Sequence, residues 1–221
     1  LVSTQSATDL RNIPDSSCDY IFTDPPFGNN LMYSELNFIW EAWLHVVTNC
    51  QPEAIINNTQ GKHLVEYQSL MTKAFSEFFR ILKPNRWMTV EFHNSKNSVW
   101  NAIQTALQRS GFVVADVRTI DKKQVSFNQG KGASQAIKQD LVISAYKPKD
   151  SFRRDILDKA GTAETAWDFV RQHLANIPVV VVKNGCIEVV AERQAYLLFD
   201  RMVAYHIMQG IPVPLDATDF Y

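Results

Sequence analysis

A short hydrophobic strand that ends at two consecutive prolines constrains the fold of this 221-residue chain most strongly. Residues 20–22 are Tyr-Ile-Phe, which favour β structure, and Asp-Pro-Pro-Phe-Gly follows at residues 24–28. Neither proline can donate a backbone hydrogen bond, and each fixes its own φ at about −65°. Asp24, which precedes them, is held extended. Because ligands of open α/β sheets bind beyond the carboxyl ends of strands, this loop is predicted to present a carboxylate and an aromatic ring at a binding edge.

Apolar periodicity divides the rest of the chain into helices and strands. We predict helices at residues 34–47, 63–82, 95–108, 152–160, 164–175 and 192–208, and strands at residues 87–93, 112–120 and 141–146. An Asn-Gly pair within residues 179–190 predicts a hairpin, and residues 1–9 are expected to be the tail of a strand. Since no helix separates the last two strands of residues 1–150, these strands are predicted to be antiparallel neighbours.

The Asp-Pro-Pro-Phe sequence resembles the motif of the S-adenosylmethionine-dependent amino-methyltransferases, which methylate exocyclic amines. Their substrates are mostly adenine or cytosine in DNA, and sometimes guanine in RNA. The resemblance continues through residues 33–36, 80–84 and 111–112, and it is greatest to the adenine-specific DNA methylases. It implies an α/β fold for residues 1–150, namely the C-terminal part of a Rossmann-like methyltransferase sheet with a reversed last strand. Residues 151–221 are then expected to be a small α+β appendage of helix, hairpin and helix.

The resemblance implies catalytic roles for Asp24, Pro25, Pro26 and Phe27. An exocyclic amine is a poor nucleophile because its lone pair is delocalised into the ring. Hydrogen bonds from the amine to the Asp24 carboxylate and to a backbone carbonyl near Pro25 would localise that lone pair toward the methyl donor. A base in a duplex must be flipped out to be reached. Phe27 is expected to stack on it, an interaction worth ~1–3 kcal/mol.

Four further positions are expected to lie at the site with Asp24. By resemblance, Asp9 and Asp24 would contact the cofactor, although a turn cap is an equally good interpretation of Asp9. Tyr33 is a candidate for the wall of the base pocket, with core packing the favoured alternative. His93 and Asn94 follow a predicted strand and would either contact the base or orient the motif loop. A structural role is the commoner one for a histidine at such a position.

Charge patterning suggests a contact with nucleic acid. The chain as a whole carries a net charge of −1, but residues 118–159 hold ten basic and five acidic residues. Lys122, Lys123 and Lys131 lie in the long loop of residues 121–139, and we expect them to contact a nucleic-acid backbone, with duplex DNA favoured. A solvated charged loop would have the same composition. The polar residues 48–61 are predicted to be an exposed connector.

The expected cofactor is S-adenosylmethionine, although its glycine-rich motif does not occur in these residues. We therefore expect that motif upstream of these residues, and we expect the remainder of the same polypeptide or a companion subunit as a partner. Three cysteines without Cys-x-x-Cys spacing favour reduced thiols in a cytoplasm and disfavour a metal site. No apolar run approaches the ~20 residues of a membrane span.

Two other functions remain open. Some RNA amino-methyltransferases that modify guanine or adenine carry a similar Thr-Asp-Pro-Pro-aromatic-Gly sequence. A non-catalytic nucleic-acid-binding subunit is the other alternative, and the intact residues 24–27 argue against it.

Overall fold

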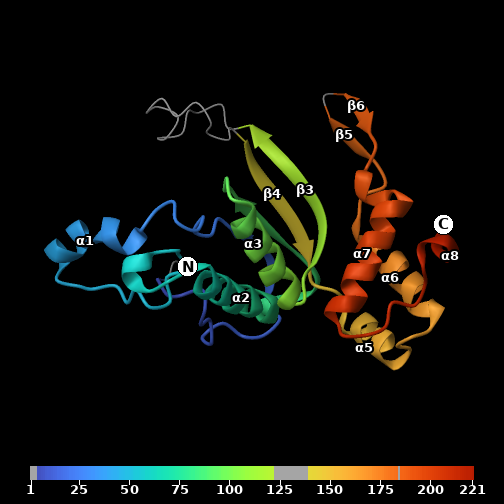
Figure 1. Ribbon diagram of the computed structural model, residues 1–221, viewed down its shortest axis with the longest axis horizontal. Coiled ribbons are helices and arrows are strands. Elements are labelled where there is room, and N and C mark those ends of the chain that lie inside the picture. Colours follow the sequence, from blue (N-terminus) through green and yellow to red (C-terminus); the bar gives the residue numbers. More distant parts are fainter. Residues whose placement is uncertain (1–3, 122–138, 184) are drawn as a thin grey trace.

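The computed structural model describes residues 4–121, 139–183 and 185–221, and it contains a four-stranded mixed sheet (Figure 1). The strands lie in the order β1-β2-β4-β3. They are β1 (Cys18–Thr23), β2 (Leu82–Phe92), β3 (Val113–Asp121) and β4 (Gln139–Tyr146). β1 and β2 are parallel, whereas β4 is antiparallel to both of its neighbours. The α/β fold with a reversed last strand is thus confirmed.

Two amphipathic helices cover one face of this sheet, α2 (Leu64–Ile81) and α3 (Asn97–Arg109). Their apolar residues recur at helical spacing, and the inward-facing ones are buried against alternate residues of β2. The buried side chains of this first core include Tyr67, Met71, Phe75, Met88, Val90, Phe92, Val99, Ile103 and Leu107. A capping box between His63 and Glu66 begins α2. Both helices were predicted from the sequence and are confirmed.

The connection from α2 into β2 contains a turn. Cys18 of β1 pairs with Leu82 of β2, and Tyr20 pairs with Trp87, so the pairing advances two residues along β1 and five residues along β2. The extra residues form an irregularity in which Asn85 adopts a φ of 61°. Asparagine tolerates this left-handed conformation better than most residues, which is why the turn forms without glycine.

A second buried cluster joins the C-terminal helices to the sheet. These helices are α5 (Asp150–Asp158), α6 (Ala163–Asn176), α7 (Ala195–Met208) and α8 (Ala217–Phe220). Their apolar side chains pack with Val113, Ala115 and Tyr146 of β3 and β4. A hairpin of β5 (Val181–Lys183) and β6 (Cys186–Glu188) projects between α6 and α7, as the Asn-Gly pair predicts, and a 3-10 turn (Ala191–Arg193) follows it.

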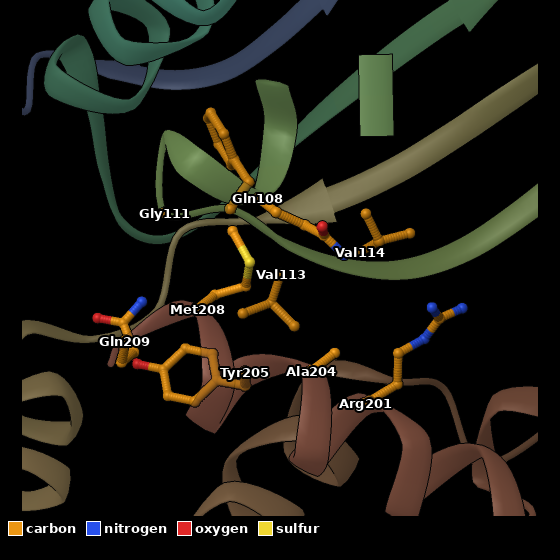
Figure 2. Close-up of a pocket in the computed structure, with 10 residues that line it drawn as sticks. Gln108, Gly111, Val113, Val114, Arg201, Ala204, Tyr205, Met208 and Gln209 are labelled. Carbon is orange, nitrogen blue, oxygen red and sulfur yellow. The ribbon is translucent and has the colours of Figure 1, made fainter. Parts of the chain in front are cut away.

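A small cavity of about 40 Å³ marks the junction between α7 and the start of β3 (Figure 2). Tyr205 and Ala204 of α7 face Gly111 and Val113 across it. None of the described residues predicted for the site lines this cavity. This cavity is a gap in the packing between the first core and the second buried cluster.

Two sequence-based expectations differ from the structure. The described residues 4–9 form turns and irregular chain and not a strand. The helix predicted at residues 34–47 is α1 (Tyr33–Leu44), but it buries no side chain; it lies at the opposite end of the molecule from α5–α8. Within the described ranges, no helix combines the length and apolar character that crossing a membrane requires.

Candidate active site

The Asp-Pro-Pro loop lies at the carboxyl end of β1 and lines a cavity of about 680 Å³. The Asp24 side chain is exposed, whereas Pro25 is buried behind it. The cavity is lined by residues 4–8, residues 23–26, Tyr33, residues 48–49 and 52–54, and Met71, Ala74 and Phe78 of α2. The expected binding edge is therefore open, and the carboxylate is at its surface.

Three hydrogen bonds hold the loop after Pro25. The Tyr67 hydroxyl of α2 donates to the Pro26 carbonyl at 2.7 Å. Asn94 Nδ2, just beyond β2, donates to the Phe27 carbonyl at 2.8 Å. The Ile56 amide donates to the Gly28 carbonyl at 3.0 Å. Elements that are far apart in sequence thus fix the course of the loop.

Gly28 is required by the local geometry of the loop. Its φ is +74°, a left-handed conformation that favours glycine. A Cβ atom at this position would lie 3.4 Å from both Ile56 Cδ1 and Val99 Cγ1. That distance is ordinary van der Waals contact, so the turn away from the motif depends on the conformation that glycine allows and not on its size.

Glu53 is a second carboxylate in the cavity, beside Asp24. Its two oxygens accept hydrogen bonds from the Ser34 amide at 3.0 Å and the Ser34 hydroxyl at 2.6 Å, which anchors the first turn of α1. Tyr33, 41% exposed, faces the same cavity. Burial raises the pKa of Tyr33, and the charges of Asp24 and Glu53 raise it further. The cavity is thus acidic as well as partly apolar.

Phe27 is not among the residues that line this cavity. Its ring packs edge-on against Phe92 at 5.2 Å between centroids and lies 6.3 Å from the His93 ring. His93 Nδ1 in turn lies 2.9 Å from an oxygen of Asp140 on β4. The motif loop therefore presents its acid and its aromatic ring to two separate surroundings.

Comparison with known proteins identifies the family. The family model of the N6/N4 DNA methylases matches residues 18–194, which include both the motif loop and most of the sheet. The chain belongs to this DNA methylase family. A comparison with curated protein sequences finds no match.

Matches to solved structures were also found for this chain. A protein from Thermus thermophilus, provisionally described as a DNA modification methylase, is 15% identical with a TM-score of 0.39, and the match covers 76% of this chain and 62% of that one. The same protein complexed with S-adenosyl-L-methionine is 16% identical with a TM-score of 0.38, covering 76% and 64%. The cyclase SpnF is 14% identical with a TM-score of 0.39, covering 66% and 55%. The chain spans less than two thirds of the length of these proteins.

The structure brings together some of the predicted site residues of this chain and separates others. Asp24, Pro25, Pro26 and Tyr33 line one cavity, so the core packing favoured for Tyr33 is wrong. Asn94 contacts the motif loop, as one of its two predicted roles requires.

Asp9 lies outside the residues that line the cavity, although its neighbours at 4–8 line it. Its exposed carboxylate pairs with Arg11, and hydrogen bonds from Arg11 hold the pKa of Asp9 below its usual value. Asp9 Oδ1 also accepts a hydrogen bond from the Arg11 amide. This geometry is that of a turn cap, which was the other interpretation of Asp9. Lys122, Lys123 and Lys131 lie outside the described residues.

Sequence reasoning missed two residues of the site. Glu53 belongs to the loop predicted to be an exposed connector, and that prediction is wrong for Ala54 and Ile55, which are buried. Residues 48–49 are exposed as predicted, and they also line the cavity. Tyr67 was assigned only to the core of its helix. A buried tyrosine hydroxyl needs a hydrogen-bond partner, and this requirement is the signal that could have singled it out.

Proposed function

We propose that this chain carries the amine-binding part of an S-adenosylmethionine-dependent methyltransferase that modifies the exocyclic amine of adenine in DNA. The observation that carries the proposal is the exposed Asp24 carboxylate, which stands on a proline-stiffened loop at a sheet edge and faces a cavity. Membership of the N6/N4 DNA methylase family supports methylation of an amine. Adenine is proposed over cytosine on the sequence resemblance alone.

The cavity suits the cofactor in its chemistry. S-adenosylmethionine supplies an electrophilic methyl group on a sulfonium, and it also carries an ammonium group. Asp24 and Glu53 provide negative charge for such a cation, and Met71, Ala74 and Phe78 provide apolar wall for its uncharged parts. Binding by these residues remains a proposal.

The chain's own residues would act on the amine by hydrogen bonding. Asp24 would accept one N–H of the amine, and the Pro25 carbonyl would accept the other. Two such acceptors favour a tetrahedral nitrogen, whose lone pair is then available for reaction. The Phe27 ring, which does not line the cavity, would stack on the extruded base.

Methyl transfer to DNA by the full-length protein tests the proposal. Asp24→Ala is expected to lower kcat by about 10²–10³-fold, the usual loss when a preorganised electrostatic partner is removed. Asp19→Ala is the matched control, because Asp19 is an exposed acid at the other end of β1, where it pairs with Lys83. The control is expected to retain wild-type turnover. Equal turnover by Asp24→Ala and wild type would contradict the proposed role, and transfer to transfer RNA but not to duplex DNA would contradict the substrate.

A further inference from the structure

We infer that Tyr67 and Asn94 are positioning residues, which aim the Pro25 carbonyl and the Asp24 carboxylate at the methyl acceptor. The inference rests on the proposed function, because it assigns a role in that reaction to side chains behind the loop. Both side chains contact the backbone of the loop and neither lines the cavity.

Tyr67 is a fully buried residue of α2 whose hydroxyl reaches the motif loop. The hydroxyl donates to the Pro26 carbonyl, and a hydrogen bond from the Gly28 backbone partly offsets the rise that burial causes in the pKa of Tyr67. The same oxygen therefore engages the chain on both sides of Phe27. A phenol in these surroundings keeps its proton and remains a donor.

Asn94 is itself held in one orientation. Its Oδ1 accepts the Lys96 amide at 2.7 Å, so the amide group can only direct Nδ2 toward the Phe27 carbonyl. Its own backbone carbonyl accepts the Trp100 indole N–H at 2.8 Å. With 8% of its surface exposed, Asn94 is a rigid donor and not a flexible surface group.

The hydrogen bonds to the carbonyls of the motif loop indicate that Tyr67 and Asn94 position the Pro25 carbonyl. The carbonyls of Pro26, Phe27 and Gly28 each accept a donor from a different segment of the chain. Within the described residues, no donor reaches the carbonyl of Pro25. Because Pro26 follows it, Pro25 is restricted to an extended ψ of about +120 to +160°. Within that range the direction of the Pro25 carbonyl depends on how the next peptides are held. The bonds from Tyr67 and Asn94 hold those peptides.

Tyr67→Phe in the full-length protein is the test, because it removes one oxygen and leaves the ring in place. We expect kcat for methyl transfer to fall about 10–100-fold, since small misplacements of reacting groups cost on this order. The KM for S-adenosylmethionine is expected to stay within about twofold, because the binding walls are unchanged. Amide exchange of a peptide spanning residues 24–30 is expected to accelerate about tenfold. Asn94→Ala is expected to change kcat and exchange in the same direction.

Tyr146→Phe is the matched control. Tyr146 is also fully buried, and its hydroxyl lies 3.1 Å from His173 Nδ1 in the C-terminal cluster. It is expected to leave kcat and the exchange of residues 24–30 at wild-type values. Wild-type kcat and exchange in Tyr67→Phe would overturn the inference, as would an equal loss in Tyr146→Phe. If the wild-type protein transfers no methyl group, the proposed function fails, whereas the exchange comparison still tests the positioning.

Discussion

Acidification is expected to destabilise the C-terminal helical cluster through His173. This side chain is fully buried on α6, where it stacks on Phe169 at 5.4 Å between ring centroids with an interplanar angle of 16°. Its Nδ1 lies 3.1 Å from the Tyr146 hydroxyl. Burial lowers the pKa of His173 to about 4, from an ordinary value of 6.5. The folded protein therefore holds this imidazole neutral.

The sign of the effect follows from the two pKa values. In the unfolded chain the imidazole takes up a proton near pH 6.5, whereas in the folded protein it does so only near pH 4. The stability from neutral burial is present in full above pH 6.5 and is lost as the pH falls through this window. Each pKa unit corresponds to about 1.4 kcal/mol, so the loss is about 3 kcal/mol. This is a large part of a typical unfolding free energy of about 5–15 kcal/mol.

Urea unfolding between about pH 7.5 and pH 4.5 measures this loss. The glutamine of His173→Gln cannot take up the proton. The change in unfolding free energy between these pH values should therefore be about 3 kcal/mol smaller in this variant than in wild type, although the variant is also less stable at neutral pH. His45→Gln alters an exposed histidine and should keep the wild-type profile. A wild-type profile in His173→Gln would refute the reasoning.

Two further predictions concern packing and the α2–β2 junction. Gly111 has a φ of +94°, and a Cβ there would lie 3.1 Å from the Phe79 ring, so Gly111→Ala should cost about 1–2 kcal/mol in strain plus a packing penalty. Gly161 has a similar φ of +85°, but a Cβ there would have nothing within 4 Å, so Gly161→Ala should lower the unfolding free energy in urea by less than Gly111→Ala does. Equal losses in the two variants would contradict the packing penalty at Gly111. Lys147 donates from a buried position to two backbone carbonyls at the junction, so Lys147→Met should lower the unfolding free energy by about 1–3 kcal/mol. The exposed Lys149→Met should stay near wild type, and a comparable loss there would count against this account.

The elements with strong local patterns were predictable from sequence. α2 and α3 carry apolar residues at helical spacing over several turns, and both fold where that spacing places them. The antiparallel pairing of β3 and β4 followed from the absence of a predicted helix between them. In each case neighbouring residues in the sequence determine the outcome.

The parts that depend on distant contacts were not predictable. α1 has apolar residues at helical spacing, yet Trp40 and Trp43 are 69% and 81% exposed because no other described element packs on them. Residues 48–61 were expected to be an exposed connector, but Lys62 Nζ bonds to the carbonyls of Cys50 and Glu53 and holds this loop in place. Nothing in the local sequence indicates such a long-range bond.

The position of Asp24 at an open sheet edge was predictable, whereas the support behind it was not. The strand followed by two prolines placed the carboxylate at the carboxyl end of β1. Its support comes from Tyr67, Asn94 and Ile56, which lie about 30 to 70 residues further along the chain. Periodicity identified Tyr67 as a core residue but could not tell which backbone group its hydroxyl would meet.

The most direct measurement of the central claim is the chemical identity of the methylated product. The full-length protein would be incubated with methyl-labelled S-adenosylmethionine and duplex DNA, and the DNA digested to nucleosides and separated. The account predicts that the label appears on N6-methyladenine and disappears with Asp24→Ala. Label on N4-methylcytosine would contradict the choice of adenine, and the absence of label from both methylated amines would contradict amine methylation of DNA.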